Sequence, residues 1–206
     1  MPSGRRRFRR SLGERRYRKL YVIATEGEKT EPQYFAIFRD PESVIRLKRL
    51  KAGRSSAPAH VLKRMEEHLK KERLRGTDEA WLVVDKDPWT VEQLEQLHRR
   101  AEQRPNYGFA LSNPKFESWL LLHCEDGGAH DLLPRLRRHL PEYDKGIRSS
   151  QFTEQRIREA VERAKRRDHH SGADWPRSDG TTVYRLVEHP LGSARLTGKR
   201  RASPWL

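Results

Sequence analysis

Residues 81–87 read Trp-Leu-Val-Val-Asp-Lys-Asp, an apolar run that ends abruptly in two acids one residue apart. A run rich in Val and Leu favours a buried β-strand, whereas carboxylates are costly to bury unless a positive charge lies beside them. In an open α/β sheet, ligands bind where the strands reach their carboxyl ends. The stretch therefore predicts a core strand over 80–85 that ends in a cation site at Asp85 and Asp87.

A second segment has the same arrangement. Residues 20–25 are an apolar run that predicts a strand, and Glu26 and Gly27 follow it. The glycine lets the backbone turn closely beneath a site. Mg²⁺ binds oxygen ligands, usually one or two carboxylates with waters and phosphate oxygens, and two strands that deliver acids to one sheet edge are typical of phosphoryl-transfer sites. We therefore expect Glu26, Asp85 and Asp87 to share one ion. The alternative is that the two aspartates only cap the turn after their strand.

Strands and helices alternate along the first part of the chain. Strands are expected over 20–25, 44–50, 80–85 and 107–111, and helices from residue 30 and over 58–75, 90–104 and 113–124. This alternation predicts an α/β fold with a mainly parallel sheet flanked by helices. After residue 126 the pattern becomes helical and basic, with an exposed helix expected over 151–167 and a short apolar piece, helical or extended, over 181–187.

The domain organisation follows from these patterns. We expect a basic tail over 1–18, a single α/β domain over 19–190 whose helical part begins near residue 127, and a second basic tail over 191–206. A chain of 206 residues is long enough for one domain of ordinary size.

Charge is the strongest compositional signal. The chain carries 44 Lys and Arg against 29 Asp and Glu, a formal net charge of +15, and its mean hydropathy is −1.02. An excess of one sign predicts a polyanionic partner, here DNA or RNA. The N-terminal tail, with Arg5, Arg6 and Arg7, is expected to contact nucleic acid. A merely solvated tail is the equally weighted alternative.

Other classes of protein are disfavoured. Cys124 is the single cysteine, so the chain has neither an internal disulfide framework nor a cysteine-based zinc site. It has no run of 18 apolar residues that would span a membrane. The basic start lacks the apolar segment of a secretory signal. We therefore expect a cytoplasmic protein that does not contact membranes.

Three lysines lie beside the acids. Lys29 and Lys86 either contact the scissile phosphate or neutralise the carboxylates, and the two interpretations carry equal weight. A helix is expected to begin at Asn113, where its N-terminus would attract phosphate with help from Lys115. Glu117 in the first turn is favoured by the helix dipole, and its place after a third strand end also permits a metal-binding role.

Four motifs in this order resemble the RloB family, proteins first noted beside bacterial type I restriction–modification loci. The motifs are Glu-Gly-Glu-Lys-Thr-Glu-Pro-Gln-Tyr-Phe at 26–35, Asp-Lys-Asp at 85–87, Ser-Asn-Pro-Lys-Phe-Glu-Ser-Trp-Leu-Leu-Leu-His at 112–123 and Tyr-Asp-Lys at 143–145. The resemblance covers about residues 19–187, most of the chain.

The resemblance implies a Toprim-like fold, whose arrangement of metal-binding acids is shared with topoisomerases, primases and OLD-type nucleases. It implies that Glu26, Asp85, Asp87 and Glu117 bind Mg²⁺ or Mn²⁺ in catalysis and that Lys145 is a catalytic lysine. The implied activity is metal-dependent phosphodiester hydrolysis of DNA or RNA in anti-phage defence or a restriction-associated system, with an ATPase or a restriction subunit as partner. The alternative is a non-catalytic nucleic-acid-binding or regulatory subunit of a defence complex.

The basic tail generates a first prediction. Deleting residues 1–18 removes eight arginines and one glutamate, so nucleic-acid affinity should fall less steeply with salt than in the intact chain, because fewer counterions are released on binding. Binding isotherms on one duplex between about 50 and 200 mM salt measure the two slopes. Equal slopes would show that the tail is only solvated.

Overall fold

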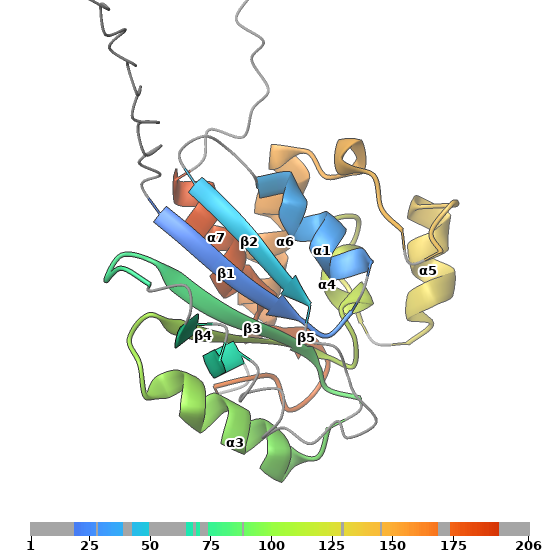
Figure 1. The fold of residues 1–206 in the computed structure, drawn as a ribbon. Helices are drawn as coiled ribbons and strands as arrows, with labels where there is room; N and C mark the ends of the chain where they lie inside the picture. Colours follow the sequence, from blue (N-terminus) through green and yellow to red (C-terminus); the bar gives the residue numbers. More distant parts are fainter. Residues whose placement is uncertain are drawn as a thin grey trace, which may run out of the picture.

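The computed structural model of the chain describes residues 19–27, 29–38, 43–49, 65–67, 69–70, 74–87, 89–128, 130–144, 146–168 and 174–193. Within these residues, a five-stranded sheet lies between helices (Figure 1). The tail 1–18, with Arg5, Arg6 and Arg7, lies outside the described residues, as does most of 191–206. Of the helix predicted over 58–75, residues 65–67 and 69–70 are helical, whereas residues 74 and 75 are not, and the other residues of that range lie outside the described part of the chain.

The sheet is mostly parallel, as predicted. Its strands run in the order β2-β1-β3-β4-β5, in which the first four are parallel and β5 is antiparallel to β4. The strands are β1 (Lys19–Thr25), β2 (Ser43–Arg49), β3 (Glu79–Asp85), β4 (Tyr107–Asn113) and β5 (Gly180–Thr181). The predicted strand over 44–50 is therefore the edge strand β2.

Each central strand serves two cores, because successive side chains point to opposite faces of a sheet. In β1, Tyr21 and Ile23 join one buried cluster, while Leu20, Val22 and Ala24 join the other. Strands that are covered on both faces read as continuous apolar runs, which explains the two segments that identified this fold in the sequence.

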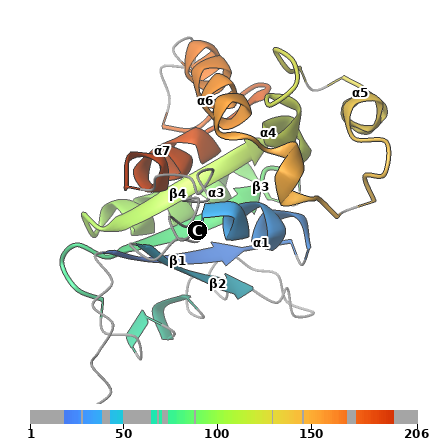
Figure 2. The ribbon, with the colours of Figure 1, turned by 90° about the horizontal axis from the view of Figure 1, so that it is seen from above.

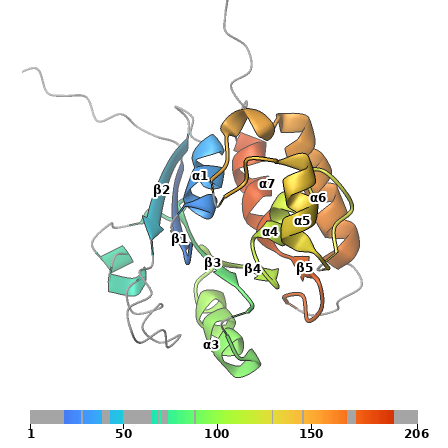
Figure 3. The same ribbon diagram turned by 90° about the vertical axis from the view of Figure 1, so that its right-hand side faces the viewer.

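Helices cover both faces of the sheet unequally. Most of them lie on one face: α1 (Thr30–Phe35) with the 3₁₀ turn η1 (Ala36–Phe38), α4 (Glu117–Leu121), α5 (Leu132–His139), α6 (Glu154–Asp168) and α7 (Val183–Ser193). Figure 2 shows α1, α6 and α7 on the same side of β1 and β2. On the other face lies α3 (Val91–Glu102), set apart from them in Figure 3. None of the helices in the described ranges is long and apolar enough to cross a membrane.

An aromatic cluster joins α1, α4 and the start of α6. The Tyr34 ring is fully buried, and its hydroxyl lies 3.0 Å from Nε2 of His123, whose Nδ1 lies 3.0 Å from the Trp119 carbonyl oxygen. Burial lowers the pKa of His123 to about 3, so the ring is neutral and packs as a core residue. Edge-on contacts place Phe35, Phe38, Phe116, Trp119, His123 and Phe152 around Tyr34.

The helix predicted over 113–124 is wrong at both ends. Ser112 and Asn113 pair with β5, so β4 continues two residues beyond its predicted end. The Asn113–Pro114 peptide is cis, and α4 begins only at Glu117. Residues 122–124 form turns after the helix. A pairing partner about 70 residues away in the sequence therefore overrides the local helix signal.

The helix predicted over 151–167 is present as α6, but the prediction that it is exposed is wrong. Its buried stripe consists of Ile157, Ala160, Val161 and Ala164, in which two of the four members are alanines. A stripe of small side chains has little hydrophobicity in the sequence, yet it packs in the same core as α4 and α7. The next helix, α7, extends to Ser193, beyond the domain end predicted at 190.

A cross-strand contact between β3 and β4 generates a second prediction. Gly108 lies opposite Trp81, and a Cβ atom on it would fall 2.4 Å from Cδ2 and Cε3 of the indole. Gly108→Ala should therefore destabilise the fold by about 1–3 kcal/mol through overpacking. Gly76→Ala is the control, since nothing lies within 4 Å of its added Cβ. Urea unfolding measures both variants, and equal stabilities would contradict the prediction.

Candidate functional site

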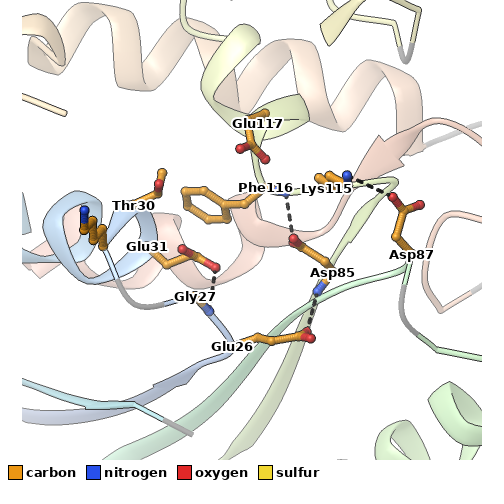
Figure 4. A pocket seen from close by; sticks show the side chains of 10 residues that line it. Glu26, Gly27, Thr30, Glu31, Asp85, Asp87, Lys115, Phe116 and Glu117 are labelled. Carbon is orange, nitrogen blue, oxygen red and sulfur yellow. Dashed lines mark hydrogen bonds and ion pairs between the residues drawn. The ribbon is translucent and has the colours of Figure 1, made fainter. Parts of the chain in front are cut away.

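A pocket of about 390 Å³ lies at the carboxyl ends of β1 and β3 and beside the segment that follows β4 (Figure 4). Eight of the ten residues that line it are polar or charged. The lining comprises Glu26, Gly27, Lys29, Thr30, Glu31, Asp85, Asp87, Lys115, Phe116 and Glu117. Five of these ten residues are acids and two are lysines, so the pocket is an acidic spot on a chain of net charge +15.

The sheet topology opens the crevice that contains this pocket. From β1 the chain passes through α1 to β2 on one side, and from β3 it passes through α3 to β4 on the other. Because α1 and α3 cover opposite faces, the loops after the adjacent strands β1 and β3 separate from each other. Ligands of open α/β sheets bind at such a point.

Glu26 and Asp85 lie together at the ends of β1 and β3. The Asp85 backbone N–H and the Trp89 indole N–H donate to the same oxygen, Oε2 of Glu26, at 3.4 Å and 3.1 Å. Oδ1 of Asp85 accepts from the backbone N–H of Phe116 at 2.9 Å. These hydrogen bonds connect three segments of the chain and orient both carboxylates toward the pocket (Figure 4).

Glu31 is a member of the site that the sequence analysis did not assign. It lies in the first turn of α1, is 6% exposed, and accepts the backbone N–H of Gly27 at 3.0 Å. A Cβ atom on Gly27 would lie 2.0 Å from Oε2 of Glu31, so the glycine is needed for this close approach. The signal in the sequence was an acid in the first turn of the helix that follows the first strand.

The buried acids raise one another's proton affinity. Burial, with the charges of Glu31, Glu26 and Glu117, raises the pKa of Asp85 from its ordinary value of 3.8 to about 8. Burial also raises the pKa of Glu31, and the charges of Glu117 and Glu26 add to that effect. Desolvation and like charges both disfavour the ionised form, so this group of acids favours a bound cation or proton.

Glu117 reaches the pocket from the start of α4 and is 4% exposed. The Tyr143 hydroxyl donates to its Oε1 at 2.9 Å and lies 3.4 Å from Oγ1 of Thr30. Burial holds the pKa of Tyr143 above its ordinary value. The sequence analysis included Tyr143 only as part of a motif, because nothing in its local pattern predicts that it would lie beside Glu117.

The remaining predicted site residues have different positions. Asp87 and Lys115 line the pocket, each about half exposed, with Nζ of Lys115 3.4 Å from Oδ2 of Asp87. Lys29 also lines the pocket, whereas Lys86 does not. Lys145, predicted as a catalytic lysine, lies outside the described residues.

The donor chemistry of the pocket fits Mg²⁺ or Mn²⁺, which prefer carboxylate oxygens. Within the described ranges, however, no three acidic, histidine or cysteine side chains stand close enough to hold an ion as they are arranged. Asp87 in particular pairs with Lys115 (Figure 4). The acids nearest one another, on which a cation would relieve repulsion, are Glu26, Glu31, Asp85 and Glu117.

The sequence profile of RloB-like proteins matches residues 21–189. The chain belongs to the RloB-like family. The match spans every residue that lines the pocket and extends through most of α7. No significant match to the chain was found among curated proteins or among solved structures.

The pKa of Asp85 gives this RloB-like chain a testable pH dependence. The folded state holds a proton that the unfolded chain releases near pH 3.8. The contribution of protonated Asp85 to the free energy of unfolding is therefore fully present below that pH and is lost as the pH rises through about 8. Asp85→Asn cannot ionise, so its stability relative to the native chain should increase across this interval.

Thermal melting of both proteins in metal-free buffer from pH 4 to pH 9 measures this difference. The difference between their melting temperatures should change steadily and level off above pH 8. A difference that is constant across the series would show that Asp85 ionises as it does in water.

Proposed function

We propose that this RloB-like protein is a Mg²⁺- or Mn²⁺-dependent nuclease that hydrolyses phosphodiester bonds of DNA or RNA in a defence or restriction-associated system. The observation that carries the proposal is the meeting of Glu26, Glu31, Asp85 and Glu117 in one pocket between Lys29 and Lys115. The resemblance to Toprim-like nucleases assigns the same role to three of these acids, and membership of the RloB-like family supports the link to defence.

The acids would hold the ion, and the lysines would bind the substrate. A bound divalent cation supplies charge stabilisation on a phosphate and an activated water at neutral pH. Glu26 is kept in place by the Trp89 indole, and Asp85 by the Phe116 backbone N–H. Lys29 and Lys115 lie where they can neutralise phosphate oxygens beside the acids.

The wider surface suits a nucleic-acid partner. With a net charge of +15, the chain attracts a polyanion from a distance, and the attraction is strongest at low salt. The pocket itself repels phosphate until a cation is bound, since five acids face two lysines there. Strand binding and cleavage should therefore depend on different parts of the protein. The basic surface would bind the strand, and a bound cation would allow one phosphate to approach the acids.

A second candidate function is a non-catalytic nucleic-acid-binding or regulatory subunit. The observation that favours it is the separation of the side chains: within the described part of the chain, no three possible ligands form a coordination group. Such a subunit would bind nucleic acid by its charge and would show no activity that depends on the acids.

Substitution of the acids distinguishes the two functions. Asp85→Ala and Glu26→Ala should each reduce cleavage by more than about 100-fold, because even outer partners of metal ligands commonly contribute 10- to 100-fold. Chelation of divalent ions should abolish cleavage, while binding to the strand survives. Glu102→Ala, a change at an exposed acid on α3, is the matched control and should retain activity.

The assay uses labelled DNA and RNA, with the chain alone and with the proteins encoded beside it, in Mg²⁺ and in Mn²⁺. Cleavage that persists in the Asp85→Ala protein would place the chemistry in another protein. Strand binding without cleavage under every condition would favour the non-catalytic subunit.

A further inference from the structure

Tyr143 belongs to the helical C-terminal part of the chain, and its side chain reaches an acid of the pocket by a hydrogen bond. Its hydroxyl donates to Oε1 of Glu117 at 2.9 Å. It lies between α5 and α6, 26 positions after its partner in the sequence. The contact therefore arises from tertiary packing and not from local geometry.

The surroundings hold the Tyr143 ring firmly. The side chain is 4% exposed within the larger core cluster, and the Tyr143 backbone N–H donates to the Leu140 carbonyl at 2.9 Å. The backbone carbonyl of Tyr143 accepts from Nε of Arg137 at 3.4 Å. The hydroxyl of a ring held in this way stays within hydrogen-bond distance of Oε1 of Glu117, at 2.9 Å, and 3.4 Å from Oγ1 of Thr30.

A hydroxyl donor lowers the cost of burying Glu117. It is 4% exposed, and a buried carboxylate without hydrogen bonds is costly. Tyr143 binds Oε1 of the carboxylate, and the Glu117 side chain lines the pocket. Outer partners of metal-binding carboxylates fix their orientation, and their removal typically weakens metal binding by 10- to 100-fold.

We propose that Tyr143 is the positioning residue of Glu117: its hydroxyl holds one carboxylate oxygen so that the other faces a divalent cation in the pocket. The inference rests on the proposed metal-dependent function, which it deepens by bringing the C-terminal helical part into the site. Tyr143 acts through Glu117 and has no contact with the substrate.

The test measures Mn²⁺ binding by isothermal titration calorimetry on the full chain, without nucleic acid. Tyr143→Phe removes only the hydroxyl and should weaken Mn²⁺ binding by at least about 10-fold. Tyr184→Phe is the matched control, because the Tyr184 hydroxyl also donates to a carboxylate, Oδ2 of Asp168 at 2.7 Å, away from the pocket. It should leave Mn²⁺ affinity unchanged.

A double-mutant cycle separates positioning from general stabilisation. In a Glu117→Gln background, Tyr143→Phe should have no further effect on Mn²⁺ affinity, because the carboxylate that it orients is gone. Additive losses would overturn the inference. Melting curves without metal accompany each variant, and a Tyr143→Phe protein that fails to fold while Tyr184→Phe folds would assign the hydroxyl a purely structural role, which also overturns it.

The control for the underlying function is Asp85→Asn. If the native chain binds Mn²⁺ and Asp85→Asn does not, unchanged affinity in Tyr143→Phe refutes only the role of Tyr143. If the native chain and Asp85→Asn bind Mn²⁺ equally, the metal site itself is absent and both proposals fail.

Discussion

Repulsion between carboxylates in a place with little water is the constraint on which this structure depends. Glu26, Glu31, Asp85 and Glu117 meet at one pocket, and burial together with the charges of the other three acids raises the pKa of Asp85 to about 8. Left to themselves, these side chains would move apart. Hydrogen bonds from Trp89, Phe116, Gly27 and Tyr143 hold them together. An arrangement that is unfavourable for the empty protein is what one expects of a site whose stability is completed by a ligand.

The parallel sheet makes this arrangement possible. Neighbouring parallel strands lie about 4.8 Å apart, so side chains that follow β1 and β3 meet without any long loop. The chain then leaves the two strands toward opposite faces, and the crevice between the departing loops is the pocket. The acids on the first turns of α1 and α4 complete it. The position of the site is thus a property of the topology, whereas its chemistry is a property of four or five side chains.

The sequence predicted the sheet well, because strands buried on both faces are continuous apolar runs with little ambiguity. It also brought Glu26 and Asp85 to one edge, since both follow such runs. It did not assign a role to Glu31 or Trp89, whose roles depend on how α1 and the loop after β3 fold back. It placed the start of a helix at Asn113 because Asn-Pro resembles a cap, whereas pairing with β5 keeps that residue in a strand. Interactions between distant segments are the ones that local patterns do not contain.

Strand β5 is only two residues long, yet it is synthesised long after the strand whose edge it covers. The edge of β4 is covered by Thr181 and Thr182: the Leu111 backbone N–H donates to Oγ1 of Thr182, and the Ser112 and Thr181 hydroxyls lie 3.0 Å apart. These partners come about 70 residues after the strand that they cover. On a translating ribosome, β1 to β4 emerge first, with an unpaired edge that is open to pairing with other chains. The growing chain therefore passes through a stage in which the strands and acids of the pocket have been synthesised and the edge of β4 is still uncovered.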